Sequence, residues 1–291
     1  MKLNLENIEL CLDPFPYAIV KNFLDEKDLE ALIEQFPKNA KSFQNVMGGR
    51  FRLSSEEAEF YRFLGVSTVW EDFYTELNNY HFVLEVIKLF EETIPQYNPV
   101  GEFKSYKFDK NFLRRGIDKQ SIKIQEIART QAHAVSSKNL IYFVFSRFVR
   151  KLSAAFGFFE AKEKKEMYLH LDISEADVGY QREIHHDNDN RIAAMVFYLT
   201  DQNDMVGGEF GIHEYKIKRP LSECEPHPAA EQMKATKIFQ PARNTLILFL
   251  STPNSYHSVP QITAASASRK FIYGGITTKE KRAWLNAIPT R

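Results

Sequence analysis

The sequence predicts an α+β fold in which helices pack on an antiparallel β core. Amphipathic helical patterns fill most of the first 95 residues, whereas from Met167 onward the chain changes to short β-type runs separated by turns. Seven such runs in about 110 residues are typical of a β sandwich or barrel and not of a parallel α/β sheet. We expect one domain over residues 1–291, with 1–166 as mainly helical support and insertion and 167–280 as the β core.

Local patterns define the N-terminal elements. Residues 15–24, FPYAIVKNFL, are rich in β-forming side chains and predict a strand that joins the main sheet. In residues 25–36 the apolar side chains recur at i, i+3, i+4 and i+7 behind an acidic start, which predicts a helix. Ser54 and Glu57 have the spacing of a capping box that opens the next helix, and residues 68–94 continue the helical pattern.

The other segments outside the β core give weaker patterns. Residues 121–135 and 139–157 predict helices, with a basic loop at 107–119, and residues 279–287 predict a short closing helix. Residues 101–150 carry 11 basic against four acidic side chains, although the whole chain has no net charge. This segment could steer an anionic substrate, but a solvated helical face explains the same charge.

The composition argues against several classes of protein. The basic residues form no dense stripe of the kind that binds nucleic acid. The longest apolar runs are too short to span a bilayer, and the first residues lack the apolar centre of a signal peptide. Cys11 and Cys224 lie far apart with no paired spacing, which argues against a disulfide framework or a cysteine zinc site. We therefore expect a cytoplasmic enzyme or binding domain.

The stretch EIHHDNDNR, residues 183–191, concentrates possible metal ligands. In a strand, residues i and i+2 point to one face, so His185 and Asp187 would present an imidazole and a carboxylate together. His186 has an amide residue at i+2, which is a poor ligand for a divalent metal. His257 begins a β run 70 residues after Asp187 and can supply the third ligand. Two histidines and a carboxylate form the facial triad of non-haem Fe(II) oxygenases.

A second His-x-Asp pair, His170 and Asp172, lies fifteen residues upstream inside an apolar strand pattern without a turn. Polar positions occur by chance on half-exposed strands, so we expect this pair to line the pocket at most. The remaining histidines have no partner pattern, and we expect surface or satisfied core positions for His81, His133, His213 and His227.

The segment from His185 to Ile276 resembles the Fe(II)/2-oxoglutarate-dependent dioxygenases, in particular their prolyl-hydroxylase-like branch. The motifs occur in the order of that branch: HHDN, Arg191, FYLT, GGEF, QPARNTLILF, HSV and Arg269. Thr200 and Asn244 depart from it, where Asn and Gly are usual. The N-terminal residues 15–36 also resemble the module that often precedes this core, whereas residues 100–165 have no counterpart.

The resemblance implies a double-stranded β-helix core, a jelly-roll or cupin-like fold, with N-terminal and mid-chain helices packed on it. It implies that His185, Asp187 and His257 bind Fe(II) and are the catalytic centre. It further implies 2-oxoglutarate and O2 as co-substrates, with ascorbate as a candidate reductant. Because a carboxylate occupies the position of Asp187, hydroxylation or a related oxidation is expected in place of halogenation.

The resemblance also implies how 2-oxoglutarate is bound. Arg269, twelve residues after His257, matches the family's cation for the far carboxylate, which a guanidinium can bind in a bidentate manner. Strand alternation favours Arg269 over Lys270 for this role. Tyr198 matches a family tyrosine that contacts the same carboxylate, and a core aromatic residue explains it equally well. Gly207 and Gly208 predict a tight turn.

Three functions remain open at this stage. The first is a 2-oxoglutarate-dependent hydroxylase that acts on a small molecule or glycan, with a protein hydroxylase of prolyl type as the alternative. The second is a metal cupin that does not use 2-oxoglutarate. Arg269 argues against it, because such a cupin has no need of a cation twelve residues after its last metal ligand. The third is a non-catalytic β domain that binds ligands or partners. A DNA-repair demethylase is disfavoured, because no basic and aromatic groove is evident.

Overall fold

The computed structural model describes residues 1–6, 8–37, 44–46, 49–118, 164–201 and 205–285. Contacts divide the chain into two compact units, Met1–Arg114 with Lys165–Arg291, and Arg115–Lys164. The helices expected at 121–135 and 139–157 lie outside the described residues. One domain over the whole chain therefore stays a prediction, and the elements below belong to the first unit.

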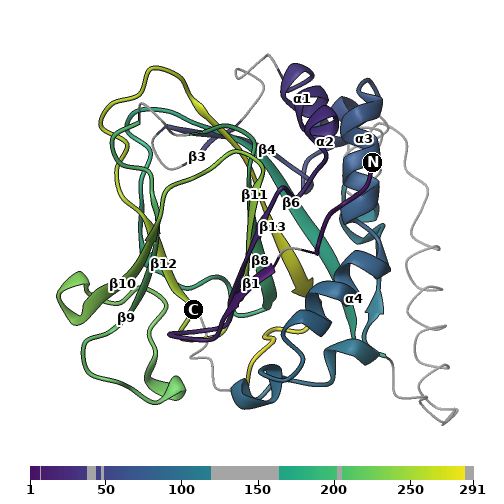
Figure 1. Ribbon diagram of the computed structural model, residues 1–291. Helices are drawn as coiled ribbons and strands as arrows, with labels where there is room; N and C mark the ends of the chain where they lie inside the picture. Colours follow the sequence, from purple (N-terminus) through teal and green to yellow (C-terminus); the bar gives the residue numbers. More distant parts are fainter. Residues whose placement is uncertain (7, 38–43, 47–48, 119–163, 202–204, 286–291) are drawn as a thin grey trace, which may run out of the picture. The chain divides into compact units, whose positions relative to one another are not determined.

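The first unit consists of strands and of helices near its N-terminus (Figure 1). Its helices are α1 (Glu26–Glu34), α2 (Ala58–Leu64), α3 (Thr68–Leu77) and α4 (Tyr80–Leu89), with short 3-10 turns at Ile94–Tyr97, Phe103–Ser105, Leu221–Glu223 and Ala230–Gln232. Its strands are β1 (Ile8–Cys11), β2 (Tyr17–Lys21), β3 (Gln44–Val46), β4 (Arg50–Ser54), β5 (Lys107–Phe108), β6 (Glu166–Ala176), β7 (Arg182–His185), β8 (Arg191–Tyr198), β9 (Phe210–Tyr215), β10 (Met233–Phe239), β11 (Thr245–Leu250), β12 (Tyr256–Val259) and β13 (Arg269–Thr278).

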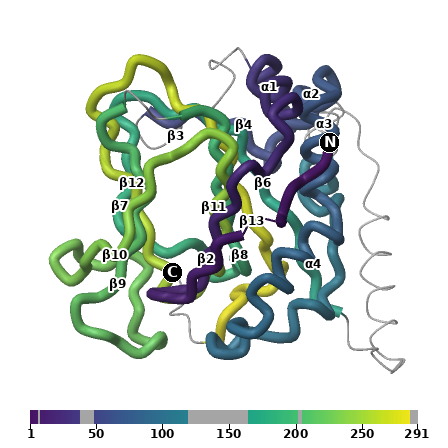
Figure 2. Tube along the Cα trace, in the orientation of Figure 1, coloured from purple at the N-terminus to yellow at the C-terminus, as the bar shows by residue number. Residues whose placement is uncertain are grey.

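The strands form two facing sheets. The nine-stranded sheet runs β1-β2-β11-β8-β13-β6-β4-β3 with β5 beside β6, and the four-stranded sheet runs β10-β9-β12-β7 (Figures 1 and 2). All neighbours are antiparallel except β5 and β6. Consecutive strands alternate between the sheets over much of the core, as in a double-stranded β-helix. The predicted α+β class and core type are confirmed.

The central strands of the large sheet are buried on both faces. In β8, Met195 and Phe197 pack toward the N-terminal helices, whereas Val196 and Tyr198 pack toward the small sheet. Phe73 of α3 stacks on Phe197 with ring centroids 6.0 Å apart. This double burial explains why RIAAMVFYLT reads as an unbroken apolar run, since neither face of the strand meets water.

The N-terminal predictions are largely confirmed. The β-rich run forms β2, which joins the large sheet between β1 and β11. The amphipathic stripe of α1 buries Leu29 and Leu32. Helices α3 and α4 begin at side-chain caps, because the Ser67 hydroxyl and the Asn79 amide oxygen accept from backbone N–H groups.

The predicted capping box at Ser54 and Glu57 is wrong. Ser54 is the last residue of β4, where it pairs with Asp172 of β6. Glu57 is the N-cap of α2 and makes no side-chain cap. The spacing of the two residues matches a capping box, but pairing with β6 places Ser54 in the sheet. This pairing is a long-range effect that a local sequence motif cannot predict.

Two further expectations need correction. Residues 279–285 form no helix: the Trp284 indole N–H donates to the Arg191 carbonyl at 3.1 Å, and Trp284 makes a bridge with Pro99. Long-range contacts of a buried tryptophan therefore replace helical bonds. The basic loop expected at 107–119 is largely structured, because it begins with a short strand, β5, at Lys107–Phe108, and residues 112–118 are helical. Both cysteines are free thiols, as expected. None of the described helices combines the length and apolar character needed to cross a membrane.

Candidate active site

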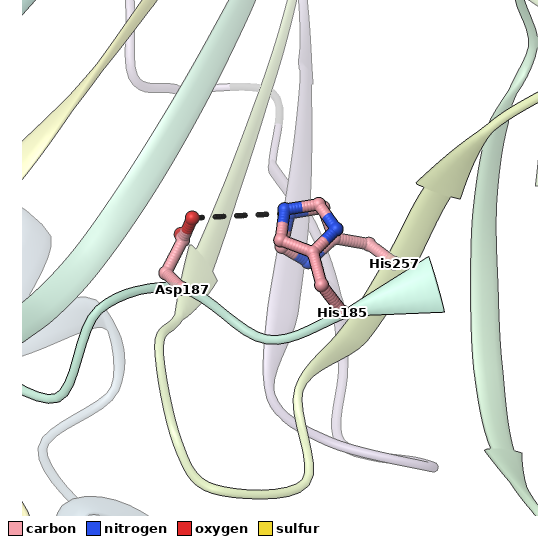
Figure 3. Close-up of side chains that lie close together, drawn as sticks. All are labelled: His185, Asp187 and His257. Atoms are coloured by element: carbon pink, nitrogen blue, oxygen red, sulfur yellow. Dashed lines mark ion pairs between the residues drawn. The ribbon is translucent and has the colours of Figure 1, made fainter. Parts of the chain in front are cut away.

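The two candidate histidines are brought together by strand pairing. His185 is the last residue of β7 and His257 is the second residue of β12, and the two are direct partners in the antiparallel ladder. Their ring centroids are 4.3 Å apart. Asp187 lies in the loop after β7, and the three candidate ligand atoms lie within 4.8 Å of one another (Figure 3). All three side chains are buried.

This geometry corrects the argument that predicted the pair. His185 and Asp187 do not share a strand face, because β7 ends at His185. The loop that follows instead returns the Asp187 carboxylate toward the histidines (Figure 3). His186 lies elsewhere, with its ring 5.9 Å from that of Tyr256. The three predicted residues do lie close together. The loop after β7 brings Asp187 to the histidines, and not the alternation of side chains along a strand.

Backbone carbonyls set the tautomers of both histidines. Nδ1 of His185 lies 2.8 Å from the Glu183 carbonyl oxygen, and Nδ1 of His257 lies 3.0 Å from that of Ser255. A carbonyl only accepts, so each Nδ1 carries the proton and each Nε2 keeps a lone pair. Burial lowers the pKa of both histidines, which keeps the rings neutral. Neutral imidazoles are the form that binds a metal.

The carboxylate of Asp187 is held in its ionised form. The Tyr273 hydroxyl donates to Oδ1 at 2.7 Å, and the Ser251 hydroxyl donates to Oδ2 at 3.3 Å. Burial opposes ionisation, but the Arg191 guanidinium and the hydrogen bond from Tyr273 favour the charged form, and the pKa of Asp187 lies below its ordinary value. The position of the acid is therefore fixed from the large sheet.

The donor set fits a divalent metal ion, with one competing contact. Two imidazole nitrogens and one carboxylate oxygen, all buried, match the facial triad of non-haem iron sites. The Arg182 Nε–H group, however, donates to Nε2 of His185 at 3.1 Å. Metal binding at that nitrogen would replace this hydrogen bond. Among the residues described, no other three potential metal ligands lie this close together.

Arg269 lies in the same cavity, at the start of β13. Its side chain is 2% exposed, donates to the Gly208 carbonyl, and keeps an Nε–H group without a partner among the described residues. Lys270 points to the other face of the sheet, where its ammonium lies 4.9 Å from the Phe36 ring centroid. The predicted alternation is thus confirmed. The Tyr198 ring lies 5.7 Å from the Arg269 guanidinium carbon, and burial raises the pKa of Tyr198 to about 12.

The turn before β9 depends on glycine. Gly207 and Gly208 both have positive φ, +83° and +84°. A Cβ atom on Gly207 would lie 1.9 Å from the Gln261 carbonyl oxygen. The predicted tight turn is therefore present, and it also presents the Gly208 carbonyl to Arg269.

One cavity of about 290 Å³ contains every predicted site residue. His185, Asp187 and His257 line it together with Arg269 and Tyr198. His170 and Asp172 line it as well, but they pair with each other at 3.2 Å and with arginines, and they do not belong to the three-ligand group.

Several lining residues were not predicted. The hydrogen bond of Tyr273 to Asp187 depends on tertiary structure, and no local pattern predicts it. His227 lies parallel to the His185 ring at 6.1 Å, although no sequence pattern marks it. Arg50 and Arg52 alternate in RFRLS, which is a strand signal, but nothing local shows that this strand borders the cavity. His213 instead pairs with Ser258 at 2.7 Å.

The two facing sheets and the buried His-Asp-His cluster define a double-stranded β-helix with a candidate metal centre. Residues 160–275 match the family model of the 2OG-Fe(II) oxygenase superfamily, where 2OG denotes 2-oxoglutarate. This match confirms the resemblance and the predicted enzyme class. Enzymes of this superfamily use Fe(II), 2-oxoglutarate and O2.

Solved structures of similar fold include hydroxylases and an epimerase. A prolyl 4-hydroxylase from Phytophthora capsici is 12% identical, with 95% of this chain and 62% of that chain covered at a TM-score of 0.43. A Pseudomonas putida prolyl-4-hydroxylase is 11% identical, with 91% and 94% covered at 0.44. A non-heme alpha ketoglutarate dependent epimerase from nogalamycin biosynthesis is 9% identical, with 90% and 76% covered at 0.44. The chain thus spans about 62% of the length of the first of these. No curated protein shows significant sequence similarity.

Proposed function

We propose that this protein is an Fe(II)- and 2-oxoglutarate-dependent dioxygenase that hydroxylates a small molecule or glycan. In this proposal His185, Asp187 and His257 bind the iron and form the catalytic centre. The observation that carries the proposal is the convergence of two imidazole lone pairs and one ionised carboxylate in a cavity that also holds a buried arginine. A metal cupin without 2-oxoglutarate has no need for that arginine.

Arg269 is proposed to bind the far carboxylate of 2-oxoglutarate. The Arg269 guanidinium is 2% exposed, and the described residues provide it with a carbonyl but no carboxylate. An anionic ligand would therefore supply the missing partner, with two parallel hydrogen bonds. Tyr198 is proposed to support the same carboxylate, because its ring lies beside this guanidinium.

The chain's own residues would position the reactants and exclude water. Fe(II) with bound 2-oxoglutarate supplies the oxidation of a substrate C–H bond by O2, with release of succinate and CO2. Phe210 and Phe249 pack around His257, with ring centroids 5.6 Å and 4.8 Å from it, and cover the site on that side. Tyr273 and Ser251 hold the carboxylate of Asp187 in place.

Slow succinate formation without added substrate tests the reaction class. Purified protein with Fe(II) and 2-oxoglutarate should form succinate, and His185→Ala should abolish this activity. His81→Ala, an exposed histidine, is the matched control and should retain it. Activity that survives in His185→Ala but disappears in His170→Ala would show that the other His-x-Asp pair binds the metal.

A second measurement tests the co-substrate site. Arg269→Ala should raise the apparent KM for 2-oxoglutarate at least about tenfold, because a charge-assisted contact in a buried site is lost. Lys270→Ala is the matched control, since that side chain points to the other face of the sheet. An effect confined to Lys270→Ala would contradict the assignment. Metal binding without any 2-oxoglutarate turnover would favour the cupin.

A further inference from the structure

A second charged cluster borders the cavity on strands β4 and β6. We name it the β4–β6 cluster: Arg50 and Arg52 on β4, with His170 and Asp172 on β6. All four residues line the cavity that contains the candidate iron ligands. The proposed reaction uses none of them.

Asp172 organises this cluster. Its carboxylate is 1% exposed, and Oδ2 lies 3.0 Å from Nη2 of Arg50 and 3.5 Å from Nη1 of Arg52. Its Oδ1 lies 3.2 Å from Nε2 of His170. Arg50 also donates to the Ser174 hydroxyl. One carboxylate thus holds two guanidinium groups, which leaves the cluster with an excess of positive charge.

The cluster lies next to the candidate metal centre. Tyr273 of β13 is the cross-strand partner of Asp172, and its hydroxyl donates to Asp187. The Arg50 guanidinium carbon lies 5.4 Å from the centroid of the Tyr273 ring. Tyr273 therefore lies between Arg50 and the candidate iron ligand Asp187. A small substrate can span this separation.

The residues that line the whole cavity also carry an excess of positive charge. Even without Arg182, its described lining contains four arginines against three carboxylates, namely Arg50, Arg52, Arg191 and Arg269 against Glu56, Asp172 and Asp187. An Fe(II) ion and the dianion of 2-oxoglutarate would cancel each other, so the excess of positive charge would remain. A buried cation without a counter-ion is costly, and an anionic group on the substrate would compensate it.

Arg52 is the arginine best placed to make this contact. Its side chain is 26% exposed against 11% for Arg50, and its Nη1 lies at the longer distance from Asp172. The buried Nε–H group of Arg52 has no partner among the described residues. Arg52 can therefore turn toward a ligand while Arg50 remains fixed to Asp172 and Ser174.

On the basis of the proposed function, we infer that the substrate is a small molecule with an oxyanion group, a carboxylate or a phosphate, which Arg52 binds with the support of Arg50. Asp172 is a positioning residue that holds the two arginines, and His170 supports the carboxylate of Asp172. The target C–H bond would lie between this anion and the iron ligands. The same cavity would then bind two anions at neighbouring arginines, 2-oxoglutarate at Arg269 and the substrate at Arg52. The guanidinium carbons of Arg269 and Arg50 lie 5.1 Å and 5.4 Å from the centroid of the same Phe271 ring.

Equilibrium binding tests the inference without catalysis. The protein is loaded with Mn(II) and 2-oxoglutarate under nitrogen, so that Arg269 is occupied, and is then titrated with inorganic phosphate and with acetate. At least one of the two should bind, and Arg52→Gln should weaken that binding about tenfold or more, with partial recovery in Arg52→Lys. Arg62→Gln, whose exposed side chain pairs with Glu59 on α2, is the matched control.

Two results of this titration would overturn the inference. One is that neither anion binds, or that Arg52→Gln weakens binding no more than Arg62→Gln does. The other is that Arg52→Gln loses as much affinity for 2-oxoglutarate as Arg269→Gln does, because Arg52 would then belong to the co-substrate site.

A substrate panel provides an independent test and distinguishes the two sources of oxyanion. Carboxylic acids are paired with their amides, and phosphate esters with the free alcohols, and each compound is scored for stimulated 2-oxoglutarate turnover. The anionic member of a pair should stimulate at least about tenfold more. Equal stimulation by neutral compounds would refute the inference but leave the reaction class intact. The reaction class itself fails only if wild-type protein shows no succinate formation that depends on His185.

Discussion

The three candidate ligands differ in how they are held. His185 and His257 are fixed by strand pairing and by backbone carbonyls. Asp187 belongs to a loop, and two hydroxyl groups from the large sheet fix its carboxylate. The acid therefore depends more on its neighbours than the histidines do, and the hydroxyl of Tyr273 makes the shorter of the two contacts.

Removal of that hydroxyl should weaken metal binding. We expect Tyr273→Phe to lower the affinity for Fe(II) about tenfold or more, because the orientation and the charge of Asp187 lose their main support. Titration of the metal-free protein under nitrogen measures this. The control is Tyr80→Phe, since Tyr80 is exposed and remote from the candidate site. Equal affinity in the two variants would mean that the loop alone positions the acid.

Gly275 on β13 creates the space that Arg191 occupies. A Cβ atom there would lie 2.4 Å from the Ala193 carbonyl oxygen and 2.5 Å from Nη1 of Arg191. We expect Gly275→Ala to reduce the free energy of unfolding by roughly 1–3 kcal/mol through overpacking. Urea unfolding measures this, with Gly65→Ala as the control, because a Cβ on Gly65 meets its nearest atoms at 3.5 Å. Equal stability of both variants would contradict the role of Gly275.

At this scale the sequence predicted the three residues that lie together as candidate ligands, and it predicted that Arg269 and not Lys270 faces the cavity. The alternation of side chains along a strand was sufficient to predict the face of the sheet to which Arg269 points. The partners of Asp187 were not predictable, since no local pattern reveals that Tyr273 of β13 and Ser251, directly after β11, lie beside the loop of Asp187. The same limit applies to Arg50 and Arg52.

Among the elements, the turn before β11 is tied to the segment between β2 and α1. Asn244 has a φ of 60°, its amide oxygen accepts from the Leu24 N–H at 2.9 Å, and its amide nitrogen donates to the Leu24 carbonyl at 2.8 Å. Glycine, which is usual in the family at this position, would tolerate the same φ but could not make either bond. The departure from the family pattern thus has a structural role.

Replacement of this asparagine should therefore be costly. We expect Asn244→Gly to lower the free energy of unfolding by about 2 kcal/mol, because two buried hydrogen bonds are lost and both groups of Leu24 remain unpaired. Asn22→Gly is the matched control, since Asn22 has a φ of 54° and an exposed side chain. Thermal and urea unfolding of both variants measure the difference. A stable Asn244→Gly protein would show that only the backbone conformation matters.

Long, strongly patterned elements were predictable and short ones were not. All seven β runs and the helices α1, α3 and α4 follow from periodicity. Strand β4 and strand β7 are short, and they exist because β6 and β12 pair with them. The prediction of a closing helix at residues 279–287 was wrong for a related reason. The long-range contacts of the buried Trp284 determine the local conformation.

For the whole molecule, metal binding should be linked to stability. A ligand that binds only the folded state at 100 times its dissociation constant adds about 2.7 kcal/mol to the free energy of unfolding. We therefore expect Fe(II) under nitrogen to raise the melting temperature by several degrees. His257→Ala should remove this effect, and His81→Ala should retain it. An unchanged melting temperature of the wild-type protein at saturating metal would argue against the site.

The different anchoring of the three ligands has a mechanical consequence. Both histidines belong to the small sheet, whereas Asp187 is fastened to the large sheet by Tyr273 of β13 and by Ser251 after β11. A metal ion bound to all three would therefore act as a cross-link between the two layers of the sandwich. It would resist their separation as a disulfide does, but reversibly, and a chelator would release it.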